Sequence, residues 1–530
     1  MRIDAVTLEV FNHRLSALAE EMGVALCRSA FSPNIKERRD FSCAVFDGRG
    51  NMVAQAAHIP VHLGSTPLSV RAAIERVPMQ PGDVVVLNDP YAGGTHLPDV
   101  TVVAPVYLRR ERAPFAYVAN RAHHADIGGS SPGSMPLATE IYQEGFRLPP
   151  VRIVARGRVV SEVLDLFLAN TRVADERRGD LLAQLAALRL GGRRLREIVQ
   201  RSGRRLTQRA MSALQDYSAR LMSTALRRLP AGVYRAEDWM DDDGAGALRV
   251  PIRVSVRIAH GRAVVDFSGT AAQVAGGINA NHAVTVAAVL YVFQGLAGTD
   301  IPANAGLLRP VQIIAPPGTV VNANFPAAVA GGNVETAQRI VDVLLKALAP
   351  AAPRQIPAAS CGSMNNLAVG GHDPFRGRDF AYYETIAGGA GAGPRRAGAS
   401  GVHTHMTNTL NTPVEALEAT YPLRITHYSL RRASGGTGAH RGGDGIVREI
   451  EFLASAQTTV LSERRRLRPY GQCGGGPGSS GQNLLITAHT TRRLSSKVTL
   501  NVSPGDRLRM LTPGGGGWGR RRRATPPRGS

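Results

Sequence analysis

Cysteine is scarce in this chain. Only four cysteines occur among 530 residues, and no two of them are spaced as a CxxC pair. A framework of disulfides or a thiolate zinc site needs more cysteine or closer spacing than this. The first residues, MRIDAVTLEV, also lack the basic and apolar regions of a signal peptide. We therefore expect a cytoplasmic protein in a reducing compartment.

Lysine and aromatic residues are scarce as well. Aromatic side chains make up 5% of the chain, and nearly all of its 63 basic residues are arginine. A formal net charge of +22 would suit a nucleic-acid partner, but the arginines are spread along the chain and few rings are present to stack on bases. We therefore expect no nucleic-acid binding, a solvated arginine-rich surface and a disordered basic tail at residues 516–530.

Long apolar runs and nucleotide motifs are missing. The run AVTVAAVLYVFQGLAG, which begins at Ala283, contains Thr and Gln and is too short to span a membrane, so it indicates a buried helix. No stretch matches GxxxxGK[ST], so the sequence has no ATP site of the Walker type. The glycine-rich stretches AGGIN, AVAGGNVET and IAGGAGAG could wrap a phosphate, although tight turns explain them more simply. We expect no membrane association.

Apolar residues at steps of three and four predict a helix over residues 6–30 and a central helical segment over 175–228. We expect interruptions of that segment at Gly191-Gly192 and at Ser202-Gly203. Asn333 is predicted to cap a later helix that ends at Pro350.

Alternating apolar residues predict strands on both sides of this segment, with hairpins at Asp47-Gly48 and at His260-Gly261. These patterns predict a mixed α/β (α+β) fold with several layers and several β-sheet regions. We expect an N-terminal α/β region over 1–232 and a C-terminal β-rich region over 233–515.

Side chains that bind metals are concentrated in two short stretches, NDPYAGGTHLPDV at 88–100 and NRAHHADIGG at 120–129. They are Asp89, His96, Asp99, His123, His124 and Asp126. Proline between His96 and Asp99 predicts a turn that can aim both at one point. Imidazoles with carboxylates and no thiolate suit a catalytic divalent metal such as Zn, Mn or Fe. Adjacent strand residues face opposite sides, so only one of His123 and His124 easily joins them. Polar turn residues in water would explain the same pattern.

Two further groups are candidates for the site. His403 and His405 in GVHTHMTNT would face one side of a strand, where they could complete a metal site or line a pocket, unless they are simply exposed. Glu140 and Glu144 in PLATEIYQEG could provide a general base for an activated water, or could be ordinary surface residues.

Several long motifs resemble the hydantoinase B/oxoprolinase family. They include AFSPNIKERRDFSCAVFD, LNDPYAGGTHLPDVTVVAPV, RAHHADIGGSSPGSMP and SERRRLRPYGQCGGGPG, and they span residues 3 to 518 in the family's order. The resemblance implies one subunit of an ATP-dependent cyclic amide hydrolase of the hydantoinase, 5-oxoprolinase or N-methylhydantoinase type. It also implies a hetero-oligomer with a hydantoinase A-type partner, which binds ATP and phosphorylates the lactam, while this chain opens the ring with the help of a metal.

The resemblance also implies roles for particular residues. A His, Asp and His metal site in the family matches His96 and Asp99, with His123 as the third ligand and His124 as the alternative. Asp126 and Glu140 are then the candidate catalytic carboxylates. The remaining candidates would orient a ligand or line the pocket: Asp89, His403 and His405. Because the family includes subunits of acetone and acetophenone carboxylases, an ATP-dependent ketone carboxylase is an alternative function, and a non-catalytic stabilising subunit is a third.

Overall fold

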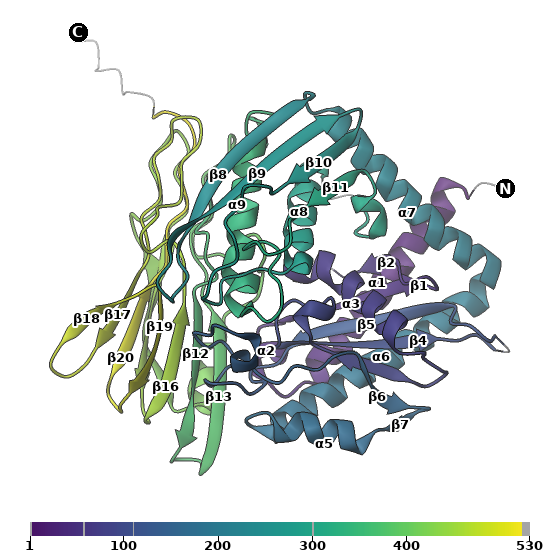
Figure 1. Ribbon diagram of the computed structural model, residues 1–530, viewed down its shortest axis with the longest axis horizontal. Helices are drawn as coiled ribbons and strands as arrows, with labels where there is room; N and C mark the ends of the chain where they lie inside the picture. Colours follow the sequence, from purple (N-terminus) through teal and green to yellow (C-terminus); the bar gives the residue numbers. More distant parts are fainter. Residues whose placement is uncertain (1–2, 57–58, 110, 299–300, 522–530) are drawn as a thin grey trace, which may run out of the picture.

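The computed structural model describes residues 3–56, 59–109, 111–298 and 301–521. Within them, four β-sheets and their helices form several layers (Figure 1). The mixed α/β fold with several sheet regions and a central helical segment is therefore confirmed. In the described part of the chain no helix is both long and apolar enough to cross a membrane.

An antiparallel seven-stranded sheet forms the N-terminal layer, in the order β2-β1-β5-β4-β3-β6-β7. Its strands are β1 (Phe41–Asp47), β2 (Met52–Gln55), β3 (Val84–Leu87), β4 (Asp99–Val106), β5 (Ala116–His123), β6 (Val151–Ala155) and β7 (Arg158–Val159). The predicted hairpin after Asp47 joins β1 to β2. This part of the chain also contains the short helices α2 (Pro33–Lys36), α4 (Ile141–Glu144) and α5 (Ser161–Ala169).

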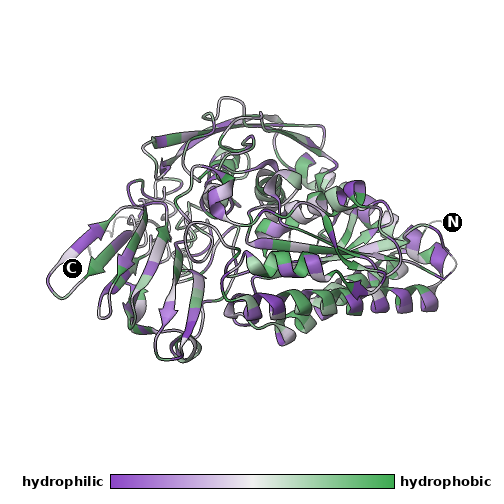
Figure 2. Ribbon diagram, turned by 60° about the horizontal axis from the view of Figure 1, so that its bottom comes forward, coloured by the Kyte–Doolittle hydropathy of each residue, from purple (hydrophilic) through white to green (hydrophobic). Residues whose placement is uncertain are grey.

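Helices cover both faces of this sheet. Arg121 of β5 reaches Ser65 and Ser69 of α3 (Pro60–Arg76), at 2.6 Å in each case. Its neighbour Asn120 points the other way and donates to the Gln184 carbonyl of α6 (Ala174–Ser202) at 2.9 Å. Helix α1 (Ala5–Ser29) packs beside α6. Buried apolar side chains of the helices and the sheet form one core cluster between these layers. Hydrophobic residues are the green stretches of the sheet and of the helices that cover it in Figure 2.

The central helical segment breaks once. Helix α6 runs through Gly191-Gly192 to Ser202, so the predicted interruption there is wrong. Gly191 serves packing instead, because a Cβ on it would lie 2.4 Å from the Met22 sulfur of α1. The break at Gly203, where φ is 83°, is confirmed, and α7 (Arg204–Arg227) follows it.

A four-stranded sheet with two buried helices forms the middle layer. Its order is β11-β10-β9-β8, from β8 (Gly232–Asp242), β9 (Leu248–Ala259), β10 (Arg262–Asp266) and β11 (Val311–Ile314). The predicted hairpin at His260-Gly261 joins β9 to β10. Helix α8 (His282–Ala297) packs against α3, and α9 (Ala337–Leu348) packs on β8 and β9. The predicted cap at Asn333 is wrong, because Asn333 lies within a π-helical turn, Gly332–Thr336, that precedes α9.

Two sheets form a C-terminal sandwich over one apolar core. One sheet has the order β13-β12-β16-β19, from β12 (Asn366–Asp373), β13 (Arg378–Thr385), β16 (Ala456–Leu461) and β19 (Lys497–Val502). The other has the order β14-β15-β20-β17-β18, from β14 (Leu423–Arg431), β15 (Gly445–Phe452), β17 (Gln482–Ile486), β18 (Thr491–Leu494) and β20 (Arg507–Leu511). Helix α10 (Val414–Thr420) precedes β14.

Four glycine-rich segments pack together at one end of this sandwich, and we call residues 388–393, 435–445, 471–478 and 514–519 the glycine bundle. Its segments hydrogen-bond through their backbones: Gly443 N–H donates to the Ala390 carbonyl and Gly515 N–H to the Gly443 carbonyl, each at 2.9 Å. A Cβ on Gly515 would lie 2.0 Å from the Ala390 oxygen. The stretch IAGGAGAG thus serves close chain packing. Residues 516–519 of the expected tail belong to the bundle, and residues 522–530 lie outside the described residues.

Candidate metal centre

The loop before β4 directs His96 and Asp99 toward each other. The 3-10 helix η1 (Pro90–Ala92) ends at Gly93, which has a left-handed φ of 85°. The chain then turns through Pro98 into β4, which begins at Asp99. His96 Nε2 lies 3.4 Å from Asp99 Oδ1. The turn predicted from the proline therefore brings both side chains to one point.

The pairing of β4 with β5 adds a third side chain. Asp99 stands opposite His123 in the antiparallel register, so both side chains lie on the same face of the sheet. The rings of His96 and His123 are 5.1 Å apart at their centroids. One ligand atom from each of His96, Asp99 and His123 lies within 4.8 Å of the others. These three residues form a group that could hold a metal ion.

The group contains buried polar atoms without hydrogen-bond partners among the described residues. They are both ring nitrogens of His96, Asp99 Oδ1 and His123 Nε2. Native proteins rarely leave such atoms unpaired, because an unpaired buried polar atom has lost its hydration without compensation. A shared cation would compensate all three residues at once. Two imidazoles and one carboxylate, with positions left for other ligands, fit a catalytic Zn, Mn or Fe ion.

A fourth buried residue, His62, supports the group, and the sequence analysis missed it. His62 Nε2 lies 3.3 Å from Asp99 Oδ2, which also accepts a hydrogen bond from Thr95. The other His62 nitrogen lies 2.9 Å from the Ser42 hydroxyl. Burial raises the pKa of Asp99, but His96 and His62 outweigh it and hold that pKa well below its usual value. Asp99 is therefore a carboxylate. No local spacing links His62 to Asp99, since their contact depends on how α3 packs on the sheet.

His123 is held by residues from both halves of the chain. Its Nδ1 lies 3.1 Å from the Asn34 amide, and its ring stacks on Tyr383 of β13. Burial and the nearby His96 lower the pKa of His123 well below its usual value. The ring is therefore neutral, which is the form that binds metals.

His124 lies on the opposite face of the sheet. Its Nε2 lies 2.9 Å from Gln184 Oε1 of α6, and its ring packs edge-on against Phe167. Burial lowers the pKa of His124 to about 4. The structure thus brings His123, and not the alternative His124, into the group with His96 and Asp99.

Three predicted carboxylates bind local backbone instead. Asp126 accepts hydrogen bonds from the N–H groups of Gly128 and Gly133 and pairs with Arg172. Asp89 caps η1, and the exposed Glu140 caps α4. In the described residues none of the three hydrogen-bonds to His96, Asp99 or His123. Their proposed catalytic and orienting roles stay predictions.

Glu144 is buried rather than at the surface. Its Oε1 accepts hydrogen bonds from the N–H groups of Val329 and Ala330, at 2.7 and 2.8 Å. Burial raises the pKa of Glu144 to about 8, despite these two bonds. Glu144 therefore ties α4 to the loop before the π-helical turn as a neutral acid at pH 7.

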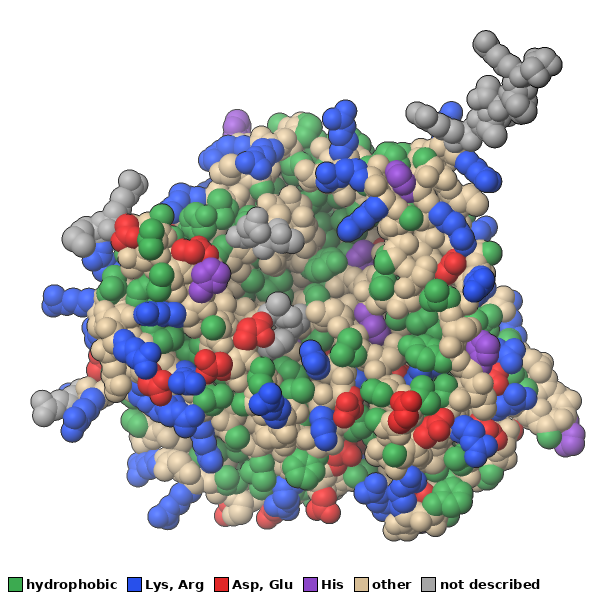
Figure 3. Space-filling model, turned by 180° about the vertical axis from the view of Figure 1, so that it is seen from behind, with side chains coloured by type: hydrophobic (Ala, Val, Ile, Leu, Met, Phe, Trp, Pro, Cys, Tyr) green, Lys and Arg blue, Asp and Glu red, His purple; other side chains and the backbone are tan. Residues whose placement is uncertain are grey.

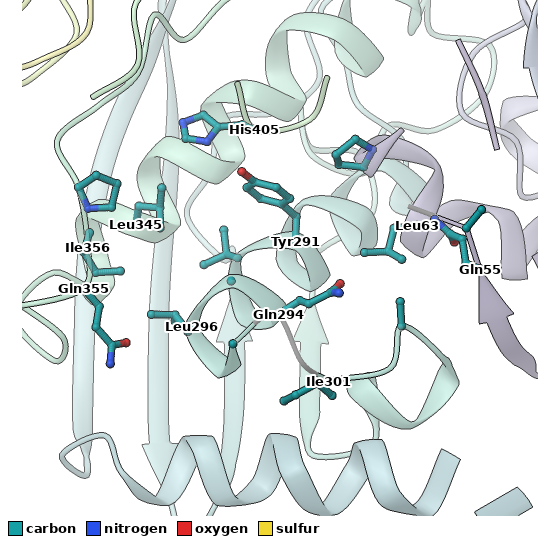
Figure 4. A pocket seen from close by; sticks show the side chains of 17 residues that line it. Gln55, Leu63, Tyr291, Gln294, Leu296, Ile301, Leu345, Gln355, Ile356 and His405 are labelled. Atoms are coloured by element: carbon teal, nitrogen blue, oxygen red, sulfur yellow. The ribbon is translucent and has the colours of Figure 1, made fainter. Parts of the chain in front are cut away.

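His403 and His405 lie on a loop and not on a strand, and both line a cavity of about 1110 Å³. Pro60 and Tyr291 line the same cavity and, together with His405, an apolar neighbour of about 580 Å³ (Figure 4). A hollow with apolar side chains on its floor and histidines near its edge is visible on the back of the molecule (Figure 3). Burial, followed by Arg38, lowers the pKa of His403 to about 4.

Comparison with known proteins shows which family the chain belongs to. The model of the family "Hydantoinase B/oxoprolinase" matches residues 4–521. The chain is 41% identical to 5-oxoprolinase 1 of Arabidopsis thaliana, over 97% of this chain but only 42% of that protein. The fold is similar to that of the ATP-dependent caprolactamase from Pseudomonas jessenii, with a TM-score of 0.92 and 30% identity over 98% of this chain and 92% of that one.

A second solved structure has the same fold. Acetone carboxylase superposes with a TM-score of 0.89 at 17% identity, over 97% of this chain and 76% of that one. Since the family model covers nearly the whole chain, the protein belongs to the hydantoinase B/oxoprolinase family.

Proposed function

We propose that this chain is the ring-opening subunit of an ATP-dependent cyclic amide hydrolase of the hydantoinase or 5-oxoprolinase type. The observation that carries this proposal is the buried group of His96, Asp99 and His123, whose ligand atoms lack partners in the described residues. The similarity over 98% of the chain to an ATP-dependent caprolactamase supports it.

A divalent Zn, Mn or Fe ion held by these three residues would supply a Lewis acid and an activated water near neutral pH. The chain's own residues prepare the site for it. Asp99 contributes the negative charge, while the buried His123 stays neutral. Arg121 hydrogen-bonds to Thr101, two residues after Asp99 in β4, and to Ser65 and Ser69 of α3. These bonds hold α3 against the sheet that carries Asp99 and His123. Burial of the ligands keeps bulk water away from the reacting amide.

The partner in this proposal is a hydantoinase A-type subunit that binds ATP. The chain spans 42% of the length of the Arabidopsis 5-oxoprolinase, so that protein has a large part with no counterpart here. The sequence also has no GxxxxGK[ST] motif. An amide carbonyl is a poor electrophile, and its phosphorylation by the partner would make attack by water easier. Together the two subunits form a hetero-oligomer.

Reconstitution tests the proposal. The purified chain alone should not hydrolyse lactams, and addition of an A-type subunit should produce ring opening coupled to ATP hydrolysis. His96→Ala and Asp99→Ala should abolish that activity while the complex still assembles. Full activity of the chain alone, or of the two variants with no metal present, would contradict the proposal. Phosphate release that depends on bicarbonate and a ketone would instead identify a carboxylase.

A further inference from the structure

We propose that His405 is a proton-transfer residue in the cavity beside the candidate metal centre, and that Asp342 orients its ring. The proposal rests on the proposed function, because it assigns one step of amide ring opening to a named side chain. Four observations carry it: the position of the cavity, the His405–Asp342 pair, the backbone conformation of His405 and the contact of its ring with Tyr291.

The cavity and the metal centre share the first turn of α3. Pro60 lines the cavity together with His405, and His62 on the same turn lies 3.3 Å from Asp99. The Val61 N–H donates a hydrogen bond to the Met406 carbonyl at 3.3 Å. Val61 precedes His62 and Met406 follows His405, so this bond links the two segments. The wall of the cavity that holds His405 is therefore connected to the metal centre through a single turn of α3.

His405 and Asp342 form a buried pair. His405 Nε2 lies 3.4 Å from Asp342 Oδ1, and the two side chains are 7% and 0% exposed. The two groups are not aligned for a hydrogen bond, which is common for catalytic pairs when no substrate is bound. Burial raises the pKa of Asp342, but His405 and Arg464 outweigh it, so Asp342 is a carboxylate. With Nε2 facing this carboxylate, Nδ1 is the nitrogen left for the cavity.

The backbone of His405 has an uncommon conformation. Its φ is 57°, in the left-handed region that side chains other than glycine adopt rarely. Such residues cost free energy and occur often at functional sites. The ring meets Tyr291 of α8 edge to face, with centroids 5.9 Å apart (Figure 4). The conformation thus places a buried, paired imidazole at the wall of a cavity.

Ring opening needs one proton taken from water and one given to nitrogen, and His405 can carry out both transfers. As a cyclic amide opens, a water oxygen bonds to the carbonyl carbon and that water gives up a proton. The bond between this carbon and the ring nitrogen breaks, its electron pair stays on nitrogen, and nitrogen gains a proton. His405 donates that proton from Nδ1 and regains one from the water, so it ends unchanged. The phosphoryl group that the partner added stays on the former carbonyl oxygen, so this step gives an acyl phosphate, and a second water hydrolyses it to carboxylate and phosphate. A positioned acid or base of this kind contributes roughly 100- to 10,000-fold to a rate.

The competing explanation is structural: the pair only ties the loop at 402–408 to α9. His405→Gly separates the two explanations, because glycine adopts a φ of 57° without strain and the imidazole alone is lost. His405→Asn is a second variant, since asparagine also tolerates this conformation. The control is His372→Asn, which removes a similar His–Asp pair that is exposed on β12, with 2.9 Å between His372 Nδ1 and Asp379 Oδ1.

The experiment uses the complex with the A-type subunit, a lactam and ATP. We expect His405→Gly to fold and to keep its metal, and its kcat to fall about 100-fold or more. Added imidazole should restore much of that loss, and more basic imidazoles should restore more. His372→Asn should keep full activity and gain nothing from imidazole. Activity of His405→Gly equal to that of the parent protein, or a loss that imidazole does not restore, would overturn the proposal.

Asp342→Asn tests the orienting role. In the parent protein, Asp342→Asn should lower kcat and leave KM nearly unchanged. In His405→Gly supplemented with imidazole, it should lower kcat no further, because free imidazole does not need Asp342 to orient it. An equal loss in both backgrounds would assign Asp342 a structural role only. If the parent complex opened no lactam at all, the proposed function itself would fail. If the parent complex were active and His405→Gly were equally active, only the role of His405 would fail.

Discussion

The imidazole of His123 stacks on the phenol ring of Tyr383, with centroids 4.6 Å apart and planes at 9°. His123 ends β5 of the N-terminal sheet, whereas Tyr383 lies in β13 of the C-terminal sandwich. The Tyr383 hydroxyl donates to Asn366 Oδ1 at 2.7 Å, which fixes the ring. The candidate metal centre is therefore built by both halves of the chain.

This stack predicts a difference between two substitutions. Tyr383→Leu removes the ring and should weaken metal binding by about 0.5–1.5 kcal/mol, which is the contribution of a stacked aromatic pair. Tyr383→Phe keeps the ring and should bind metal nearly as well as the parent protein. A competition titration with a metal chelator measures both affinities. Equal affinities for the two variants would show that the stack does not support the ligand.

The opposite orientations of His123 and His124 give a second prediction. His123→Ala should lose metal, because it removes one of the three proposed ligands. His124→Asn should retain metal and lose only stability, since it disturbs the contact with Gln184 on the other face. Elemental analysis of both purified variants decides between the two histidines. Metal loss from His124→Asn alone would reverse the assignment.

Glu144 predicts a pH dependence of stability. Its pKa rises from 4.5 to about 8 on burial. Between these values the unfolded chain releases a proton that the folded chain keeps, so this residue makes stability fall as pH rises, by at most about 1.4 kcal/mol per unit. Glu144→Gln keeps an oxygen for Val329 and Ala330 but cannot ionise.

Denaturant unfolding of Glu144→Gln and of the parent protein at pH 5 and pH 7.5 measures this effect. The stability of Glu144→Gln relative to the parent protein should be higher at pH 7.5 than at pH 5. The comparison removes the contributions of all other titrating groups, because these are present in both proteins. A difference that does not change with pH would contradict the raised pKa.

The glycine bundle predicts one severe and one harmless substitution. Gly515→Ala should lower the free energy of unfolding by more than about 3 kcal/mol, because its Cβ would lie 2.0 Å from the backbone oxygen of Ala390. Gly393→Ala lies close by in the same bundle, and a Cβ there would meet nothing within 4 Å. That control should change stability by less than about 0.5 kcal/mol. Similar unfolding midpoints for the two variants would contradict this account of the bundle.

Local patterns were sufficient for some of these features. Alternation and turn residues predict the hairpins at Asp47-Gly48 and His260-Gly261, and a proline between His96 and Asp99 predicts the turn that joins them. Local patterns failed where a contact distant in sequence decides the result. Gly191 does not end α6 because it packs against Met22, and Asn333 does not cap α9 because a π-helical turn precedes that helix.

The same limit applies to the site. Two adjacent histidines cannot be ranked without the register of β5 against β4, and that register depends on pairing along the whole strand. His62 contacts Asp99 only after α3 has packed on the sheet. The resemblance to a family placed the third proposed ligand at His123 or His124, and the fold puts His123 beside His96 and Asp99.

The register of β4 against β5 also bears on how the chain folds. A shift by one residue turns every side chain of a strand to the opposite face. Such a shift would turn His123 away from Asp99 and break the set of three ligands. An ion that binds these residues therefore adds its binding free energy to only one of the competing pairings. A bound metal would thus stabilise the native alignment of β4 and β5 over a shifted one.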